Sequence, residues 1–475
     1  MLGWVGQRWG MEVHMDAEEV DVVVIGLGPG GEDAAARLAA GGLSVVGVES
    51  RLVGGECPYF ACVPTKMMVR ASDALAEGRR VAELAGSAQV SPDWTPVADR
   101  IRDEATTGWD DTAAVQRLEK SGARFVRGFG RISAPGEVSV STGNGDRVFR
   151  TRRAILLNPG TEPVVPPVDG LRDSPYWTNR DAVRAREAPE SLLVLGGGPV
   201  GVELAQVFSR FGTRVAMVEH EQRLLGPFEP EASELLESVF EAEGIDVRTG
   251  ERAESVAHDD DSFTVRLGSG AELTAQRLLV ATGRRTDLAA LGVAAVGLDD
   301  RGRTIDVDVR MRAADGVWAI GDVTGRGAFT HTSVYQARIA ANDILGQGHE
   351  NADYRAVPAV TFTDPEVAMT GLTEAAAHDR GLPVVTATTG IPASTRGWIH
   401  KAGNQGLIKL VADPRRGVLV GATVVAPGGG EILGALAVAV HGEVPVERLR
   451  HMIYAYPTFH RAIEATLAEL PASGI

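Results

Sequence analysis

The chain has 475 residues, of which 44% are hydrophobic and 23% are charged, and its formal net charge is −16. This length exceeds one ordinary domain and predicts about three, while the composition is typical of a soluble globular protein. The acidic balance excludes nucleic acid as an expected partner, because phosphate binding requires a basic surface, and it indicates a solvated acidic surface instead.

The N-terminal segment carries no targeting signal that we recognise. Residues 1–19 lack the apolar core of a signal peptide, and Met11 and Met15 are alternative start positions before the first expected strand. No apolar run approaches the ~18 residues needed to span a bilayer. The only two cysteines share one motif, which excludes a secreted disulfide framework. We therefore expect a cytoplasmic protein with an N-terminal extension over 1–19 and no membrane partner.

A nucleotide-binding pattern follows this extension. An apolar strand is expected at 20–25, a glycine turn at 26–31, an alanine-rich helix at 32–40 and a second strand at 44–48. Such glycines allow a tight turn and a close approach of pyrophosphate to the N–H groups at the start of the helix. An acid after the second strand can accept hydrogen bonds from ribose hydroxyls. The expected binding residues are Gly26, Gly28, Gly31 and Glu49.

The next segment holds both cysteines, Cys57 and Cys62, separated by four residues. Two thiols beside a redox cofactor can store an electron pair as a dithiol and release it as a disulfide. A zinc half-site would need further cysteine or histidine ligands at metal spacing, and the nearby sequence offers none. Buried structural thiols are the other interpretation. The cysteine spacing favours redox work, and no metal site is expected.

The nucleotide-binding pattern returns in the middle of the chain. A strand is expected at 191–195, a glycine turn at 196–201, a helix at 202–211 and a strand at 215–218. The closing acid, Glu219, lies 23 positions after the first glycine of its turn, as Glu49 does in the first copy. A single glycine turn is weak evidence, but two with matched spacing and context predict two bound dinucleotides. The expected binding residues of the second copy are Gly196, Gly198, Gly201 and Glu219.

The second copy also carries information on the dinucleotide. An acid at Glu219 favours NAD over NADP, because it would repel a 2′-phosphate. His220 and Arg223 lie close in the sequence and could soften this preference.

Several further motifs occur in the order typical of one family. Asn-Pro-Gly-Thr-Glu-Pro stands at 158–163, Ala-Thr-Gly-Arg at 281–284, Trp-Ala-Ile-Gly-Asp-Val at 318–323 and Phe-Thr-Asp-Pro-Glu-Val at 362–367. With the two glycine turns and the cysteine pair, the chain from residue 20 onward resembles the pyridine nucleotide-disulfide oxidoreductases. This flavoprotein family includes dihydrolipoamide dehydrogenase, glutathione reductase, mercuric reductase and soluble transhydrogenase.

The resemblance implies an α/β architecture with two Rossmann-like domains and a C-terminal α+β domain that forms a homodimer. The FAD domain would comprise 20–166 and 286–350, the NAD(P) domain 167–285 and the dimerisation domain 351–475. In such homodimers each active site borrows residues from the partner subunit. Beyond the turns, the resemblance assigns Gly55, Lys66, Gly160 and Asp322 to FAD and Gly283 to NAD(P).

The resemblance also gives roles to the reactive residues. Hydride would pass from NAD(P)H to FAD and the electrons onward to the cysteines, with Cys62 against the flavin and Cys57 facing the acceptor. Lys66 follows Cys62 by four residues, a spacing that places both on one helix face. In the family this lysine pairs with a glutamate, here Glu203, near the reactive edge of the flavin, where the pair stabilises negative charge.

The C-terminal acid–base motif departs from the family. Thiol-active members carry His-Pro-Thr with a glutamate that orients the histidine, but here Tyr456 replaces the histidine and Arg461 the glutamate. Tyrosine, with an ordinary pKa near 10, is a poor base at neutral pH. His460 is a candidate substitute in the first turn of a helix expected after Pro457; a surface or packing histidine is the other interpretation. His331 is expected to be a structural neighbour of the flavin.

The residues between the cysteines depart as well, since Tyr59 and Phe60 stand where the family has smaller or polar residues. They either pack in the core or form an aromatic wall for a flat acceptor such as a quinone. The predicted function is an FAD-dependent NAD(P)H oxidoreductase that passes electrons through Cys57 and Cys62 to a small disulfide, quinone or metal acceptor. A mercuric reductase route is disfavoured because a second cysteine pair is absent. The alternatives are transhydrogenase-like or quinone reductase activity without the thiols, and a non-catalytic redox sensor.

Overall fold

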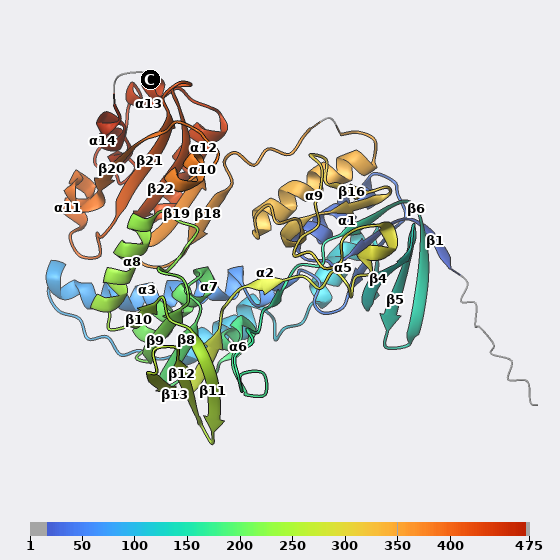
Figure 1. The fold of residues 1–475 in the computed structure, drawn as a ribbon, viewed down its shortest axis with the longest axis horizontal. Coiled ribbons are helices and arrows are strands. Elements are labelled where there is room, and N and C mark those ends of the chain that lie inside the picture. The colour runs from blue at the N-terminus through green and yellow to red at the C-terminus, as the bar shows by residue number, and fades with distance from the viewer. Residues whose placement is uncertain (1–16, 349, 472–475) are drawn as a thin grey trace, which may run out of the picture. The chain divides into compact units, whose positions relative to one another are not determined.

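The computed structural model of the chain describes residues 17–348 and 350–471. The fold is α/β, and its segments form two compact groups (Figure 1). Among the described residues, the first group comprises 17–55, 111–160, 286–348 and 350–352, and the second comprises 56–110, 161–285 and 353–471.

The first group is built on a mainly parallel sheet with the strand order β16-β17-β6-β1-β2-β3. The chain forms β1, β2 and β3 on one side and then returns to form β6 and β17 on the other, so the order reverses between β1 and β6. Ligands bind outside the carboxyl ends of parallel strands at such a reversal. The strands are β1 (Glu18–Ile25), β2 (Val45–Glu49), β3 (Arg124–Arg127), β6 (Gly145–Leu157), β16 (Arg312–Ala314) and β17 (Val317–Ala319).

Three helices and an antiparallel extension complete the first group. Most of β1 is buried because its apolar residues are covered on both faces, as in other parallel sheets. Helix α1 packs closely against α9, and β4 and β5 extend the sheet from β6. The elements are α1 (Pro29–Ala40), α5 (Thr112–Lys120), α9 (Thr330–Ile344), β4 (Phe129–Ala134) and β5 (Glu137–Thr142).

The second group contains its own parallel sheet, in the order β10-β9-β8-β14. Its order also reverses, between β8 and β14, so the second glycine turn lies at an equivalent switch point. A three-stranded antiparallel meander, β11-β12-β13, accompanies it. The elements are α6 (Asn179–Arg184), β8 (Ser191–Leu195), α7 (Pro199–Arg210), β9 (Arg214–Glu219), α8 (Pro230–Ala242), β10 (Asp246–Thr249), β11 (Ala253–Asp259), β12 (Ser262–Leu267), β13 (Glu272–Ala275) and β14 (Arg277–Val280), with the short pair β7 (Glu162–Pro163) and β15 (Arg284–Arg285).

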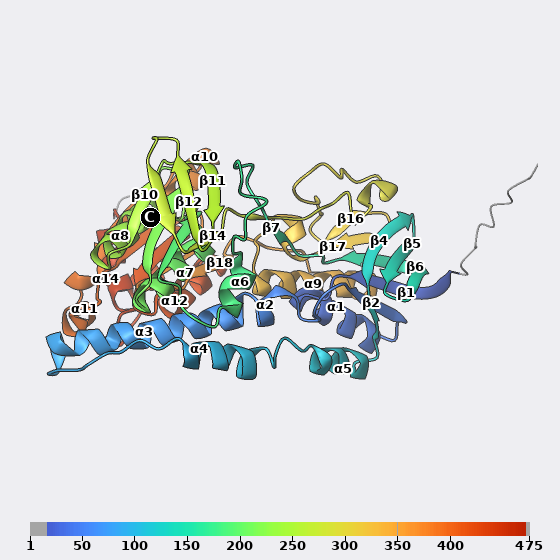
Figure 2. The ribbon, with the colours of Figure 1, turned by 90° about the horizontal axis from the view of Figure 1, so that it is seen from below.

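The cysteine segment forms a short helix and a long one. Helix α2 (Glu56–Tyr59) is a single turn, and α3 (Cys62–Leu84) continues for 23 residues and is seen along its length in Figure 2. Helix α3 packs against α7, the helix of the second glycine turn. It is followed by α4 (Thr95–Arg100) and a π-helical turn, Ile101–Ala105.

The C-terminal part of the second group is an antiparallel sheet in the order β18-β19-β22-β21-β20. Strands β21 and β22 are buried on both faces, and α12 packs on β19 and β22. The elements are β18 (Pro358–Thr361), β19 (Glu366–Gly371), α10 (Glu374–Asp379), β20 (Val385–Gly390), α11 (Thr395–His400), β21 (Leu407–Asp413), β22 (Val418–Ala426), α12 (Gly429–His441), α13 (Val446–Arg450) and α14 (Ala462–Glu469).

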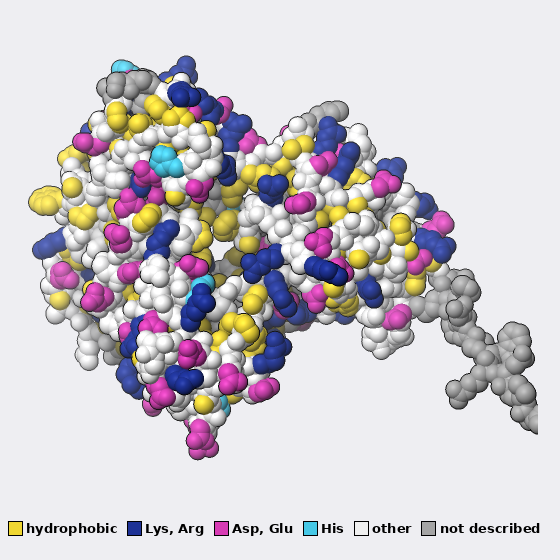
Figure 3. Space-filling view, in the orientation of Figure 1, with side chains coloured by type: hydrophobic (Ala, Val, Ile, Leu, Met, Phe, Trp, Pro, Cys, Tyr) yellow, Lys and Arg dark blue, Asp and Glu magenta, His cyan; other side chains and the backbone are white. Residues whose placement is uncertain are grey.

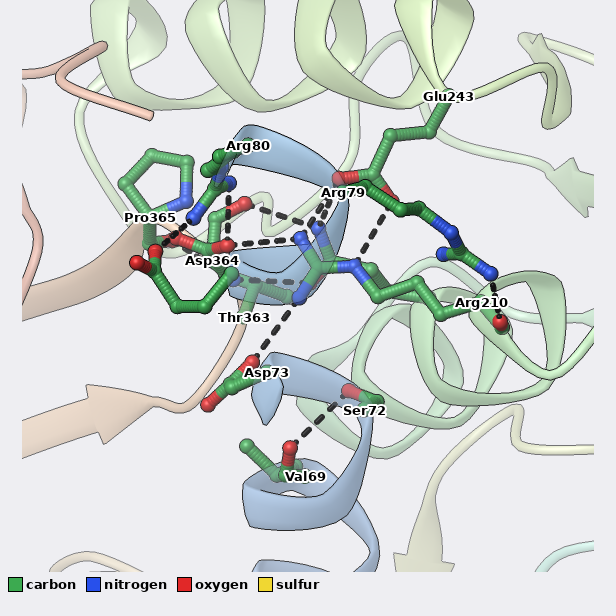
Figure 4. Close-up of polar contacts among 12 residues, drawn as sticks. Val69, Ser72, Asp73, Arg79, Arg80, Arg210, Glu243, Thr363, Asp364 and Pro365 are labelled. Atoms are coloured by element: carbon green, nitrogen blue, oxygen red, sulfur yellow. Dashed lines mark hydrogen bonds and ion pairs between the residues drawn. The ribbon is translucent and has the colours of Figure 1, made fainter. Parts of the chain in front are cut away.

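A buried ionic cluster joins α3, α7 and the loop before β19 (Figure 4). Arg210, which is 3% exposed, donates to Asp73 at 2.9 Å, to Glu243 at 2.7 Å and to Asp364 at 2.8 Å. Arg80 contributes a second guanidinium to Asp364 at 2.6 Å. Burial raises the pKa of Asp73 to about 6, and the nearby charge of Asp364 adds to this effect.

On the face drawn in Figure 3, acidic and basic side chains are interspersed. Among the helices of residues 17–348 and 350–471, none is both long and apolar enough to cross a membrane.

Candidate active site

The first glycine turn is shaped by contacts of the chain with itself. Gly26 has φ +89°, and a Cβ there would lie 2.2 Å from the carbonyl oxygen of Asn158. A Cβ at Gly31 would lie 2.1 Å from the carbonyl oxygen of Gly26. Glu49 closes the turn, because its carboxylate accepts the N–H of Leu27 at 2.9 Å. The turn therefore requires its first and last glycines for steric reasons alone.

The middle glycine of this turn has a different cause. Gly28 has φ −64° and ψ −180°, which any residue adopts, and a Cβ there would meet only Nδ2 of Asn158, at 3.3 Å. The space is left at the N-terminus of α1, where backbone N–H groups lack helical partners. A pyrophosphate fits this position, because it needs both the space and the N–H groups.

Other residues of the first group lie on the same sheet edge. Gly55 has φ +66°, and a Cβ there would lie 2.9 Å from Cα of Gly28, so this glycine lies against the turn. Asp322 is half-buried in the short 3₁₀ helix that follows β17. Gly160 follows β6 with φ +64°, and its carbonyl accepts the hydroxyl of Thr286 at 2.6 Å. These residues fit FAD in the open space at the carboxyl ends of the strands.

The second glycine turn repeats the geometry of the first. A Cβ at Gly196 would lie 2.4 Å from the carbonyl oxygen of Ala281, and one at Gly201 would lie 2.0 Å from that of Gly196. Gly198, the middle glycine, has no atom within 4 Å of such a Cβ, and Gly283 beside β14 is equally open. The space at the N-terminus of α7 thus suits a second pyrophosphate.

The acid of the second turn is buried and closes the turn. Glu219 is 8% exposed, and its carboxylate accepts the N–H of Gly197 and the N–H of Glu221. His220 is half-exposed, with Nδ1 2.8 Å from Glu219 and Nε2 3.0 Å from Glu221. Arg223 is turned into its own loop, where it donates to the carbonyls of Gly226 and Phe228 at 2.6 and 2.7 Å. Its guanidinium is therefore committed to backbone carbonyls.

The cysteine helix brings a charged pair together with α7. Cys57 is half-buried in α2, Cys62 is exposed at the start of α3, and Lys66 lies one turn further along. Nζ of Lys66 lies 2.6 Å from Oε2 of Glu203, which is 5% exposed. The other oxygen of Glu203 accepts the N–H of Phe362 at 2.8 Å, and Lys66 lies 4.6 Å from the centre of the Phe362 ring. The buried carboxylate holds the lysine ammonium in a fixed position on the cysteine-bearing helix.

Two residues between the cysteines turn out to be core residues. Tyr59 and Phe60 are each 6% exposed. The carbonyl of Tyr59 accepts Nε1 of Trp109 at 3.2 Å, and the Phe60 ring lies 4.8 Å from the guanidinium of Arg184. This burial favours the packing interpretation over an aromatic wall for the acceptor.

Sequence reasoning missed Glu56, the residue before Cys57. Its carboxylate is held by Arg180, whose Nε lies at 2.7 Å, and it also contacts Asn179 and Arg284. Arg180 is 124 residues further along the chain, and no spacing pattern links the two. The one available signal was an acid directly beside a thiol.

The C-terminal segment corrects one prediction. Helix α14 begins at Ala462, so His460 lies in the turn before it and not in the first turn of a helix, as expected. The chain after Pro457 folds back instead, with the hydroxyl of Thr458 donating to the carbonyl of Ala455 at 2.7 Å.

The two remaining candidates, Tyr456 and His331, both have exposed side chains. Tyr456 is 66% exposed, and the guanidinium of Arg461 lies 5.4 Å from its ring centre. His331 is exposed at the start of α9 and stacks on Phe329, with the ring centres 5.0 Å apart. In the parts of the chain that the structure describes, no group of three or more His, Cys, Asp and Glu side chains is arranged to hold a metal ion.

Large apolar side chains are exposed in the C-terminal part of the second group. Trp398 is 74% exposed, Val438 68% and Ile453 95%, and Tyr456 belongs to the same set.

Two dinucleotide turns, and a cysteine pair whose second member begins a helix that packs against α7, define an oxidoreductase that binds two nucleotides. Comparisons with known proteins extend this assignment. Residues 20–337 match the family model "Pyridine nucleotide-disulphide oxidoreductase", and residues 357–467 match the dimerisation domain of the same family. The chain belongs to the pyridine nucleotide-disulphide oxidoreductase family.

Individual relatives agree with the family. The chain is 34% identical to a dihydrolipoyl dehydrogenase of Thermus scotoductus, over 93% of this chain and 95% of the relative. It is 32% identical to a mercuric reductase of Acidithiobacillus ferrooxidans, over 93% of this chain and 81% of the relative. Among solved structures it is similar to the HOCl-induced flavoprotein disulfide reductase RclA of Escherichia coli, with a TM-score of 0.82 and 25% identity over 94% of this chain and 99% of that one.

These matches confirm the family, the fold class and the enzyme class that the sequence predicted. The protein is an FAD-dependent, NAD(P)H-dependent flavoprotein oxidoreductase. The match to the dimerisation domain indicates a homodimer.

Proposed function

We propose that this enzyme passes electrons from NADH through the Cys57–Cys62 pair to a small-molecule acceptor, with a disulfide as the first candidate. The observation that carries this proposal is the Lys66–Glu203 ion pair of 2.6 Å. It connects the helix that begins at Cys62 with the helix of the second dinucleotide turn. The contact is hard to explain as surface chemistry, because Glu203 is buried.

The proposed cofactor contacts follow from the two turns. Gly26, Gly28, Gly31, Glu49, Gly55, Lys66, Gly160 and Asp322 would hold FAD, and Gly196, Gly198, Gly201, Glu219 and Gly283 would hold the pyridine nucleotide. When bound, FAD accepts hydride from the nicotinamide and makes the electron pair available to the cysteines. The expected domain limits, 20–166 with 286–350, 167–285 and 351–475, remain part of this proposal.

The thiol step transfers two electrons and two protons from the cysteine pair to the acceptor disulfide. In the reduced pair, a thiolate at Cys57 attacks one sulfur of the acceptor disulfide and releases the other as a thiol. Cys62 then attacks Cys57 of the mixed disulfide and releases the second acceptor thiol. The cysteines lose two electrons and two protons, and the acceptor gains them. Lys66, held by Glu203, keeps a positive charge on the cysteine-bearing helix, where it favours anionic forms.

The C-terminal residues bear on the rate of disulfide turnover. Tyr456 in place of a histidine removes the usual base at neutral pH, and His460 no longer has the helix position that suggested it as a substitute. Turnover of a disulfide should therefore be slow unless another group accepts the proton. Exposed Tyr456 would act on the acceptor by a hydrogen bond or by packing.

We also propose NAD(H) in preference to NADP(H). Glu219 is the last residue of β9, and its carboxylate accepts the N–H of Gly197. The guanidinium of Arg223 donates to two carbonyls of its own loop. His220 is exposed, and its two ring nitrogens contact the carboxylates of Glu219 and Glu221. A 2′-phosphate would thus meet more negative than positive charge.

A metal ion or a quinone is the second candidate acceptor. Mercuric reductases are among the relatives at 31–32% identity, but the 475-residue chain has no cysteine beyond Cys57 and Cys62 to receive a metal ion. Transhydrogenase-like or quinone reductase activity without the thiols, and a sensor role, are the remaining alternatives. Both cysteines lie in one motif and do not form a disulfide framework typical of secreted proteins, so we propose that the enzyme is located in the cytoplasm.

An anaerobic NADH titration followed by visible absorbance tests the proposal. Uptake of about four electrons per subunit, with a thiolate–flavin band at about two, would support a redox-active pair. Uptake of about two electrons with plain flavin bleaching would make the cysteines spectators and favour the thiol-independent activities. Reduction that stalls with every acceptor offered would favour the sensor.

A further inference from the structure

The residue before the first cysteine is held on both carboxylate oxygens. Glu56 precedes Cys57 in the one-turn helix α2. Its Oε1 accepts Nε of Arg180 at 2.7 Å and also Nη2 of the same guanidinium. Its Oε2 accepts Nδ2 of Asn179 at 3.3 Å and lies 3.5 Å from Nη2 of Arg284. Two of these three partners are adjacent residues of helix α6.

The same helix holds the far end of the segment between the cysteines. Nδ2 of Asn179 donates to the carbonyl of Phe60 at 2.9 Å. The guanidinium of Arg184 lies between two aromatic rings, 4.8 Å from the centre of Phe60 and 5.2 Å from that of Trp109. Helix α6 therefore contacts the residue before Cys57, through hydrogen bonds to Glu56, and the segment between the cysteines, through the carbonyl and the ring of Phe60.

Helix α6 is short but its start is well fixed. Thr178 caps it and forms a capping box with Asp181, each side chain bonding to the backbone of the other end of the first turn. A helix held in this way can position Glu56 and Phe60, because its own first turn does not depend on them.

The charge at this point matters for the neighbouring thiol. The thiolate is the nucleophilic form of cysteine, and a carboxylate nearby disfavours it by like-charge repulsion. Arg180, whose side chain is 19% exposed, places an opposite charge directly on Glu56. Burial alone would lower the pKa of Arg180, but its hydrogen bonds to Glu162 and Glu56 raise it above the ordinary value, so it stays cationic.

We propose that Arg180 is a positioning residue for the cysteine pair: it fixes α2 against α6 through Glu56 and cancels the negative charge that Glu56 would otherwise place beside Cys57. This inference rests on the proposed thiol function, since it concerns the reactivity of Cys57. The acid Glu56 precedes Cys57, and the cation that neutralises this acid, Arg180, lies 124 residues further along the chain.

The test is the pH profile of Cys57 alkylation in the full-length flavoprotein, reduced with dithiothreitol. Iodoacetamide is the probe because it is uncharged, and the modified peptide is quantified by mass spectrometry. Arg180→Gln should move the midpoint for Cys57 upward by about one pH unit. The double variant Glu56→Gln with Arg180→Gln should return the midpoint to that of the parent, since the carboxylate is then absent. Arg180→Lys should restore part of the shift, because it keeps the charge without the two-nitrogen contact.

The matched control is Arg184→Gln. It removes a guanidinium from the same helix without touching Glu56, so its midpoint should move by less than half as much. A midpoint in Arg180→Gln equal to that of the parent overturns the proposal, and so does an upward shift that persists in the double variant.

A second variant covers the case in which Arg180→Gln fails to fold, as judged from its flavin content and thermal midpoint. Glu56→Gln removes the carboxylate beside Cys57 while Arg180 keeps its 2.9 Å contact with Glu162, so it should lower the midpoint for Cys57; a midpoint at or above the parent value overturns the proposal. The alkylation profile does not require electron transfer, so its outcome is separate from the NADH titration that tests the proposed function.

Discussion

The two glycine turns have nearly the same backbone geometry but different surroundings. Positions 170 residues apart correspond, so that Glu49 matches Glu219 and each closes its own turn through a backbone N–H. The second residue of the following helix differs: Gly30 is buried, with Ser333 of α9 directly beside it, whereas Val200 is 39% exposed.

The same local motif therefore occurs in two different environments. The turn itself is specified by its own glycines, which the chain requires wherever the turn occurs. What covers the start of the helix is specified elsewhere in the sequence. The first turn is closed on one side by a second helix, as suits a cofactor that stays bound, and the second is left open to solvent, as suits a substrate that comes and goes.

The largest expected effect comes from exchanging the residues at the differing position. In Gly30→Val, the new Cβ would lie 2.1 Å from Oγ and 2.8 Å from the carbonyl oxygen of Ser333, and the second of these atoms cannot rotate away. We expect a loss of about 3 kcal/mol in unfolding free energy and poor FAD retention. Val200→Gly, the matched control, should cost less than about 1 kcal/mol, because the helix penalty of glycine is about 1 kcal/mol relative to alanine and valine already carries part of it. Urea unfolding with flavin quantification measures both, and equal losses would mean that the packing of α9 on α1 does not distinguish the turns.

The residue two positions after the last glycine should show the next largest contrast. Glu203 in the second turn is buried against Lys66, whereas its counterpart Asp33 forms an exposed pair with Arg37 at 2.6 Å. Glu203→Gln should slow flavin reduction by NADH roughly tenfold, a loss of about 1.4 kcal/mol in transition-state stabilisation. Asp33→Asn should change stability and rate by less than about 0.5 kcal/mol. Stopped-flow absorbance gives the rates, and a similar effect of both substitutions would contradict a special role for the buried pair.

The acids that close the two turns, Glu49 and Glu219, should affect different nucleotides when they are substituted. Glu219→Gln removes the negative charge that would face a 2′-phosphate, so we expect the ratio of kcat/KM for NADPH to that for NADH to rise roughly tenfold. Glu49→Gln should leave this ratio unchanged and weaken FAD retention instead. Steady-state kinetics with both coenzymes measures the ratio. A change in coenzyme preference from Glu49→Gln, or none from Glu219→Gln, would argue against the assignment of FAD to the first turn and NAD to the second.

The smallest expected effect depends on pH. Helix α7 ends in buried Arg210, and its counterpart in α1 is Ala40, so only α7 carries the ionic cluster of Figure 4. The folded-state pKa of Asp73, about 6, exceeds the unfolded value near 3.9. The folded state therefore holds the proton more tightly, and stability falls as pH rises from about 4 to 6.

Asp73→Asn removes this titration and should flatten the change of stability between pH 4 and 6. The difference from the parent should stay below about 1 kcal/mol, because the Asp73 side chain is 37% exposed and solvent screens it. Urea midpoints at pH 4 and 6.5 provide the measurement. A parent whose stability rises over this interval while the variant's does not would reverse the expected sign and refute the assignment.

The turns and strands were predictable because their rules are local. The strand expected at 191–195 agrees with β8, and the acid spacing located both nucleotide turns. Both helices begin three residues earlier than expected, at Pro29 and Pro199, because proline is well suited to the first helical position and does not prevent a helix from starting there.

Long-range contacts were less accessible from the sequence. The contact between Lys66 and Glu203 was expected only through a family resemblance, since 137 residues separate the two. The clamp of Arg180 on Glu56 was missed, because neither residue belongs to a spacing pattern. The helix expected around His460 was wrong because a proline in the sequence allows a turn as readily as a helix start. The packing of Ser333 against Gly30 likewise depends on segments about 300 residues apart.

The alternation of the chain between its two compact groups has a consequence for biosynthesis. The first group is assembled from three separate stretches, the last of which ends at residue 352. A ribosome must therefore deliver about three quarters of the 475 residues before β17 and α9 can complete the first group. Nascent chains that stop earlier would lack the helix that closes the first turn, so flavin capture should be a late event in the maturation of each subunit.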